Sequence, residues 1–239
     1  MLELFVSGAE KNSGKTFITA GLAATMQSLG YSTCVYKPVQ TGAIEKSGFI
    51  QAPDLAFIKF IDPYIKTYFS YLLKNNEIPA IAAELEHTDI NKEIIYQDYL
   101  SIKKEFECII SDGTMGLATP LSDGFLEQDL VKMLEIPVLM VVSPTENSVN
   151  NTLVNINQAV SSGVKLRGVI INDCPEIIQD LSIKSMPKLI EKYTDTKILG
   201  VMPHIENLKK INPNDLISNV LTGIDIESVF DVKIAKLEL

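Results

Sequence analysis

A loop near the start of the chain has the residue types and the spacing that bind phosphate. Residues 8–16 end in Gly14-Lys15-Thr16 and lie between an apolar, strand-like run and a helical pattern. A helix N-terminus presents unpaired backbone N–H groups to an anion. In such a loop Gly14 lets the backbone approach the phosphate oxygens, Lys15 reaches the β- and γ-phosphates, and the Thr16 hydroxyl ligates magnesium. A Gly-Lys-Thr sequence that occurred by chance would fit poorly between a strand and a helix. We therefore expect the chain to bind a nucleoside triphosphate.

The length of this loop narrows the class of P-loop protein. Five residues separate Gly8 from Gly14, one more than in the common G-x-x-x-x-G-K-[ST] pattern. The loop resembles that of a deviant branch of P-loop proteins, which includes partition ATPases, the nitrogenase iron protein and several ATP-dependent carboxyl-activating enzymes. Partition-type members carry a signature lysine five positions before the P-loop lysine, where this chain has Glu10, and Lys11 comes one position later. The difference favours the small-molecule enzymes of the branch.

Composition and charge bound the remaining possibilities. The chain has 239 residues, of which 46% are hydrophobic and 21% charged, a balance typical of one globular domain over residues 1–239. A net charge of −9 argues against a nucleic-acid partner, which attracts a basic face. No apolar run approaches the roughly 20 residues that span a bilayer, and the first residues lack a secretory pattern. Cys34, Cys108 and Cys174 lack metal-binding spacing, so we expect reduced cysteines in a cytoplasmic protein.

The elements that must position the loop alternate along the chain. Strand-like runs are expected at residues 2–7, 32–36, 106–111, 137–142, 166–171 and 197–201, and helical patterns at 15–29, 54–60, 91–104, 127–134, 148–161 and 181–193. Several runs are continuously apolar, which is typical of parallel strands covered by helices on both faces. We therefore predict an α/β fold with a doubly wound, mostly parallel sheet of the P-loop NTPase type. The irregular segment 41–100 is expected to cover the active site, and 224–239 to form a short helix and strand.

In a doubly wound sheet, ligands bind at the carboxyl ends of the strands, so the residues that follow each predicted strand are candidates for the site. Lys37 and Thr41 follow the second strand. Lys37 can be a solvated turn residue, or beside a P-loop it can bind transferred phosphate or a substrate carboxylate. Asp112 follows the third strand, where P-loop enzymes place a magnesium-associated carboxylate. Asp54 opens a helix, and local sequence favours an N-cap or first-turn acid.

Polar side chains also follow two further predicted strands, and at each place they can serve either ligand binding or local structure. Ser148 and Asn150 lie in a segment that opens a helix, whose free N–H groups can hold a carboxylate. Ordinary helix capping explains the same residues equally well. Asn172 follows the fifth strand, and its amide offers a donor and an acceptor that suit the edge of an adenine. A turn is the alternative there.

Taken together, these residues resemble those of dethiobiotin synthetase. The matching motifs, in chain order, are Gly8…Gly14-Lys15-Thr16, Lys37-Pro38-Val39-x-Thr41-Gly42, Asp54, Pro79-x-x-Ala82-Ala83-Glu84, Thr119-Pro120-Leu121 and Asn172-Asp173. The resemblance covers the chain from Leu2 to about Pro203. Many enzymes share the P-loop, whereas its combination with the lysine, alanine and Thr-Pro-Leu motifs is much more specific.

The resemblance implies an ATP-dependent cyclo-ligase of biotin biosynthesis. Such enzymes take 7,8-diaminopelargonic acid, carbon dioxide and MgATP to dethiobiotin, ADP and phosphate. The diamine captures carbon dioxide as a carbamate, which accepts the γ-phosphoryl group to give a carbamic-phosphoric anhydride. The second amine then closes a cyclic urea and releases phosphate. The protein mainly supplies positioning and charge neutralisation.

The resemblance also implies a role for each matching residue. The catalytic set is Lys15, Lys37 and Thr41, and the magnesium set is Thr16, Asp54 and Asp112. ATP is expected against Lys11, Asn12, Ser13, Gly14, Lys15, Thr16, Asn172 and Pro203. The substrate is expected against Lys37, Thr41, Ser148 and Asn150, the last two lying at the interface of a homodimer.

Three residues depart from the family pattern. Asp112 replaces a glutamate and is one methylene shorter, so its contact with magnesium can require a bridging water. Asn12 replaces an acidic residue of the loop, and Lys11 adds a cation. These departures leave an altered substrate of a related ligase as an alternative. A nucleotide-switch ATPase of the partition and iron-protein type is the other alternative.

Overall fold

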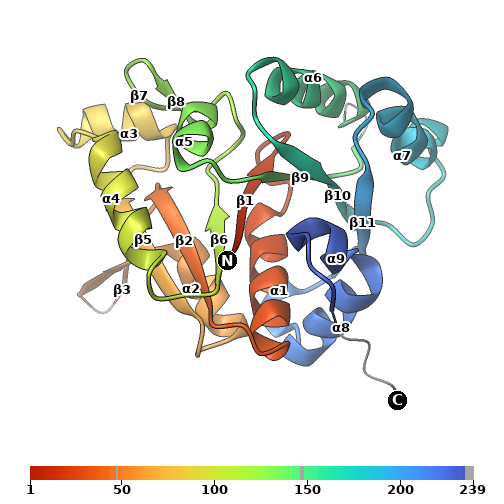
Figure 1. Cartoon of the computed structure of the whole chain (residues 1–239), viewed down its shortest axis with the longest axis horizontal. Coiled ribbons are helices and arrows are strands. Elements are labelled where there is room, and N and C mark those ends of the chain that lie inside the picture. Colours follow the sequence, from red (N-terminus) through yellow and green to blue (C-terminus); the bar gives the residue numbers. More distant parts are fainter. Residues whose placement is uncertain (47, 146–147, 235–239) are drawn as a thin grey trace.

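A seven-stranded parallel sheet forms the centre of the molecule (Figure 1). The computed structural model describes residues 1–46, 48–145 and 148–234. The strand order is β11-β10-β9-β1-β6-β2-β5, and every pairing between neighbours is parallel. The strands are β1 (Leu2–Gly8), β2 (Thr33–Gln40), β5 (Lys66–Leu72), β6 (Cys108–Asp112), β9 (Val138–Val142), β10 (Leu166–Cys174) and β11 (Ile198–Pro203). The prediction of a doubly wound P-loop-type fold is confirmed.

Helices cover both faces of this sheet because its strands are apolar on both sides. In β1, Phe5 packs into the core on one face, and Leu4 and Val6 pack into the core on the other. The first face is covered by α3 (Pro79–Leu85), α4 (Lys92–Ile102), α5 (Glu127–Leu134), α6 (Ser148–Ser161) and α7 (Leu181–Thr194). The second is covered by α1 (Lys15–Ser28), α2 (Pro53–Ile61), α8 (Pro213–Gly223) and α9 (Ile226–Phe230) (Figure 1).

Short elements complete the connections between the layers. Two antiparallel hairpins are formed by β3 (Ile44–Lys46) with β4 (Phe49–Gln51) and by β7 (Pro120–Ser122) with β8 (Phe125–Leu126), and one 3-10 turn is η1 (Leu208–Lys210). In residues 224–239 the predicted helix is α9, residues 231–234 are not a strand, and 235–239 lie outside the described residues. Within the described ranges, no helix combines the length and apolar character needed to cross a membrane.

The edge strand β5 was not predicted from the sequence; it lies in the segment 41–100, which looked irregular. Within the described residues this strand pairs only with β2, and its side chains are exposed or half-buried along its whole length. Lys66, Thr67 and Ser70 interrupt its apolar residues. The strand therefore lacks the continuous apolar run that indicated central strands such as β9.

β2 also extends further than predicted, so that Lys37 lies within a strand and not in a turn. The predicted end was Tyr36. Pairing of β2 with β6 stops at Tyr36, whereas pairing with β5 continues through Lys37 and Val39 to Gln40. Pro38 is skipped in this pairing, as expected of a residue without an N–H, and the pairing resumes at Val39. Lys37 is consequently held by the sheet.

Candidate functional site

The phosphate-binding loop connects β1 to α1 at the carboxyl edge of the sheet. Gly14 is the N-cap of α1 and has φ +84°, in the left-handed region that favours glycine. A Cβ at this position would overlap Nδ2 of Asn172. That amide nitrogen, which comes from β10, donates a hydrogen bond of 3.1 Å to the carbonyl of Ser13. The loop is therefore clamped from the neighbouring strand end, and only glycine fits at position 14.

We expect Gly14→Ala to weaken nucleotide binding at least about tenfold, because a β-carbon must displace either the loop or Asn172. Isothermal titration with ATP and magnesium measures the change. Gly30→Ala is the matched control: Gly30 also has a positive φ, of +94°, but among the described residues a Cβ there meets nothing within 4 Å. Both variants carry the left-handed strain, so equal losses of ATP affinity would contradict the clamp.

Lys15 begins α1 and lies on the floor of the site. Its side chain is buried, and its ammonium Nζ lies 3.5 Å from the carbonyl of Met115. Burial lowers the pKa of Lys15, and the charge of Asp112 opposes that effect. A long hydrogen bond to one carbonyl leaves the ammonium available to an incoming anion, such as a phosphate.

Lys37 is the electrostatic centre of the site, because two carboxylates from different elements meet at its ammonium. Nζ lies 2.8 Å from Oδ2 of Asp54 and 2.7 Å from Oδ2 of Asp112, and it donates a 2.9 Å hydrogen bond to the carbonyl of Gly113. Burial by itself lowers the pKa of Lys37, but Asp112 and Asp54 more than offset it, and the net pKa is raised. Lys37 is therefore a buried cation that stays charged. In return, it holds the pKa of Asp54 below its usual range against the effect of burial.

The same carboxylates form a set of hard oxygen ligands that suits magnesium. Asp112 accepts hydrogen bonds from Thr16 Oγ1 at 3.1 Å and from Thr19 Oγ1 at 3.2 Å. Asp54 lies close to Asp112 because the ammonium of Lys37 forms an ion pair with both carboxylates. Magnesium typically takes one or two protein carboxylates and completes its shell with phosphate oxygens and water. The residues Thr16, Asp54 and Asp112 fit such an ion.

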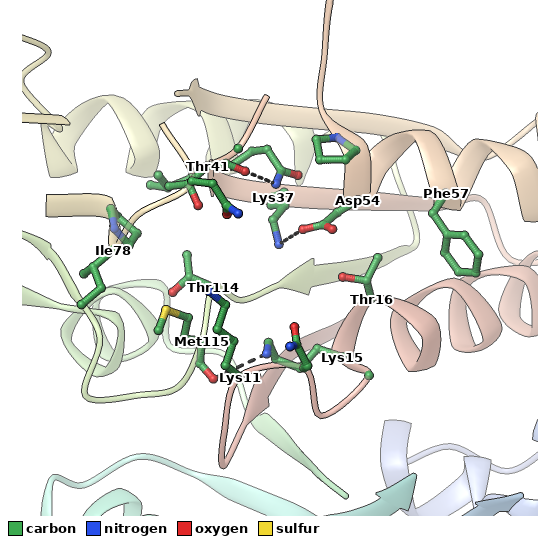
Figure 2. A pocket seen from close by; sticks show the side chains of 18 of the residues that line it. Lys11, Lys15, Thr16, Lys37, Thr41, Asp54, Phe57, Ile78, Thr114 and Met115 are labelled. Carbon is green, nitrogen blue, oxygen red and sulfur yellow. Dashed lines mark hydrogen bonds and ion pairs between the residues drawn. The ribbon is translucent and has the colours of Figure 1, made fainter. Parts of the chain in front are cut away.

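A cavity of about 680 Å³ opens above these groups. It brings together eight of the predicted site residues: Lys11, Asn12, Gly14, Lys15, Thr16, Lys37, Thr41 and Asp54. Figure 2 shows Lys37 and Asp54 across the cavity from Lys11 and Lys15. The rest of the lining includes the apolar residues Val39, Phe57, Ile78, Pro79 and Met115. The cavity can therefore receive a molecule with an anionic, phosphate-reactive end and a hydrocarbon portion.

Several predicted residues lie outside the lining of this cavity. Asp112 is buried directly beneath it, against Lys37. Ser13 is buried in the loop, and Asn172 contacts the loop from behind. Pro203 ends β11 beside Cys174 of β10, at an exposed position. Their predicted contacts with ATP stay predictions.

Ser148 and Asn150 lie at the start of α6, away from the cavity. Ser148 is 1% exposed, and its hydroxyl donates to the carbonyl of Thr145 at 2.6 Å and accepts from the Thr145 amide at 3.1 Å. The hydroxyl of Ser148 is thus hydrogen-bonded to Thr145 within one copy of the chain. Asn150 is exposed. Their contact with substrate requires a second copy of the chain and stays a prediction.

The cavity also contains residues that the sequence analysis did not assign. The segment 76–79 forms one rim, and Thr114 and Met115 form the wall beside Lys15. Pro79 opened one of the matching motifs, but the residues before it, such as Ile78, carried no pattern of their own. Thr114 and Met115 lie directly after the predicted Asp112. They could have been predicted as site residues from the rule that ligands bind at the carboxyl ends of strands.

The sequence is similar to those of known ATP-dependent enzymes, in agreement with the phosphate-binding geometry of the site. A family model described as "AAA domain" matches residues 3–212. The chain is 25% identical over 233 residues to a protein of Clostridium novyi (strain NT) named "ATP-dependent dethiobiotin synthetase BioD", covering 95% of this chain and 96% of the relative. It is 28% identical over 234 residues to a protein of the same name from Bacillus licheniformis, covering 97% of each. The resemblance found in the sequence is confirmed.

Solved structures share the fold at lower identity. The MinC:MinD cell division protein complex of Aquifex aeolicus matches with a TM-score of 0.60 and 16% identity, over 96% of this chain and 94% of that chain. The septum site-determining protein MinD complexed with Mg-ADP, from Pyrococcus horikoshii OT3, matches with a TM-score of 0.57 and 14% identity, over 95% and 94%. At this level of identity the likeness concerns the fold alone.

Proposed function

The chain belongs to the AAA domain family, and from this premise we propose that it is an ATP-dependent dethiobiotin synthetase. It would carboxylate 7,8-diaminopelargonic acid with carbon dioxide and close the ring to dethiobiotin, releasing ADP and phosphate. Relatives of that name match nearly the whole chain. The single observation that carries the proposal is the meeting of Lys37, Asp54 and Asp112 with the phosphate-loop lysine, Lys15, at one cavity.

The two lysines suit a reaction in which negative charge moves between a carbamate and a phosphate. One substrate amine adds to carbon dioxide and loses a proton, which gives the carbamate. A carbamate oxygen then attacks the γ-phosphorus, and ADP leaves. The second amine attacks the carbamate carbon, its proton departs, and phosphate leaves as the cyclic urea forms. Lys15 and Lys37 would neutralise the charge on the transferring group, and Thr41 would hold the carbamate.

Magnesium would be held by Thr16, Asp54 and Asp112, the last directly or through a water. When bound, the ion neutralises charge on the β- and γ-phosphates. Because Lys37 already joins the two carboxylates, these side chains would keep a fixed arrangement before the nucleotide arrives. Preformed charge in a buried site lowers the reorganisation that the reaction requires.

Other parts of the proposal concern binding outside the cavity. Asn172 and Pro203 would contact the adenine, since both lie near the carboxyl ends of neighbouring strands and Asn172 contacts the phosphate loop. A homodimer would place Ser148 and Asn150 of a second copy against the substrate carboxylate. The enzyme would act in the cytoplasm, without a nucleic-acid or membrane partner.

The test is phosphate release with MgATP and bicarbonate, measured with and without 7,8-diaminopelargonic acid, with the product identified by mass. We expect release that depends on the diamine, and a product of the mass of the cyclic urea. Release that ignores the diamine, in a protein that still binds nucleotide, would contradict the proposal. That result would favour a nucleotide-switch ATPase or a related ligase with another substrate.

A further inference from the structure

Glu127 is a buried acid that the proposed mechanism does not use. It is the first residue of α5, and its side chain is 1% exposed. Its carboxylate accepts hydrogen bonds from Ser7 Oγ at 2.8 Å, from the Thr114 amide at 2.6 Å and from Thr114 Oγ1 at 2.5 Å. Burial raises the pKa of Glu127, and these donors oppose that effect. Burying an ionisable group is costly, and Glu127 contacts Thr114, which lines the cavity.

The carboxylate joins two loops whose residues line the cavity. Ser7 precedes the phosphate loop at the end of β1, and Thr114 lies in the loop that follows β6. Between these loops the carboxylate lies against Gly113, where a Cβ would come within 2.9 Å of its Oε1. The absence of a side chain at Gly113 is thus what allows Glu127 to reach the backbone of the second loop.

One peptide group connects Glu127 to Lys37. The carbonyl of Gly113 and the amide N–H of Thr114 belong to the same planar peptide, and in a trans peptide they point in opposite directions. The N–H donates to Glu127 at 2.6 Å, and the carbonyl accepts from Lys37 Nζ at 2.9 Å. A carboxylate at one end and an ammonium at the other polarise the peptide in the same sense, which strengthens both hydrogen bonds.

We propose that Glu127 is a positioning residue for Lys37, acting through the Gly113–Thr114 peptide. The inference rests on the proposed function, in which Lys37 neutralises the transferring group. Glu127 fixes the orientation of the peptide, and the peptide fixes the third partner of an ammonium that otherwise contacts Asp54 and Asp112. Figure 2 shows Thr114 and Met115 together on the wall beside Lys15, and the Met115 carbonyl of the same loop lies 3.5 Å from Lys15 Nζ.

Glu127→Gln tests the role, because glutamine keeps the shape and removes the charge. We expect the diamine-dependent kcat to fall about 10- to 100-fold, since small displacements of a reacting group have effects of that size. The dissociation constant of ADP, measured by calorimetry, should change less than about twofold, because the phosphate loop keeps its backbone donors. In a Lys37→Ala background, Glu127→Gln should lower the residual turnover no further, because its effect passes through Lys37.

Ser7→Ala is the matched control, because it removes one hydrogen bond from the same carboxylate and leaves the Thr114 peptide in place. It should lower the melting temperature to a degree comparable with Glu127→Gln while kcat stays within about twofold. If both variants lose turnover in proportion to stability, or if Glu127→Gln remains additive with Lys37→Ala, Glu127 is merely structural. An unchanged kcat in Glu127→Gln would also overturn the inference.

Should Glu127→Gln fail to fold, Glu127→Asp replaces it. Aspartate keeps the charge but is one methylene too short to span Ser7 and Thr114, so we expect the same loss of kcat with ADP affinity retained. Full turnover in that variant would overturn the inference. If the unmodified chain shows no turnover that depends on the diamine, the proposed function fails and this inference fails with it. A failure of the inference alone is recognised by normal turnover in the unmodified chain.

Discussion

Lys37→Ala is expected to lower diamine-dependent turnover by about 10²- to 10³-fold, which is the typical effect of removing one preorganised group that stabilises transition-state charge. ATP affinity should change less than about threefold, because the loop amides and Lys15 hold the phosphates. Single-turnover phosphate release and calorimetric titration with ATP separate the two effects. Removing the cation also leaves Asp112 without its ion-pair partner in a buried site. Stability should therefore fall by about 3 kcal/mol.

Added magnesium should restore part of the stability of Lys37→Ala, because the ion can take the place of the ammonium between the two carboxylates. The melting temperature with and without magnesium measures this recovery. Lys59→Ala is the matched control: Lys59 lies on α2 and contacts the carbonyl of Pro63, outside the cavity. Its turnover should match that of the unmodified chain. Unchanged turnover in Lys37→Ala would show that the site is assigned wrongly.

Asp112→Asn is expected to raise the magnesium concentration needed for half-maximal turnover by about 10- to 100-fold. Asparagine has nearly the same shape, but it removes the charge that Lys37, Thr16 and Thr19 all contact. The predicted magnesium set then has one carboxylate left, at Asp54. Turnover should fall by a similar factor even at saturating magnesium, because Lys37 loses one of its two anchoring charges. Phosphate release over a magnesium titration measures both quantities.

Asp123→Asn is the control for the loss of one acidic charge. Asp123 is exposed in the turn between β7 and β8 and does not line the cavity. Its magnesium dependence should equal that of the unmodified chain. If Asp112→Asn also keeps the original midpoint, Asp112 supports Lys37 and does not take part in holding magnesium.

The phosphate loop could be predicted from sequence because its parts are contiguous. Gly14, Lys15 and Thr16 lie at the start of one helix, and local backbone geometry brings them to the same place in any protein that forms the strand and the helix. The central strands could be predicted for a similar reason, since strands enclosed on both faces read as apolar runs. β5 could not, because Lys66, Thr67 and Ser70 interrupt its apolar residues.

The chain by itself thus determined a P-loop fold and named Lys37, Asp54 and Asp112 as candidates, through strand ends and resemblance. Only the tertiary structure decided that these three side chains form one cluster. Lys37 and Asp112 come from β2 and β6, which are neighbours in the sheet although they are separated in sequence, and Asp54 comes from α2. The tertiary structure alone also decided the position of Glu127, whose hydrogen-bond partner Ser7 is 120 residues away in the sequence. A hydrogen bond across such a separation has no local signal, since it depends on how helices and strands pack and on no periodicity within either segment.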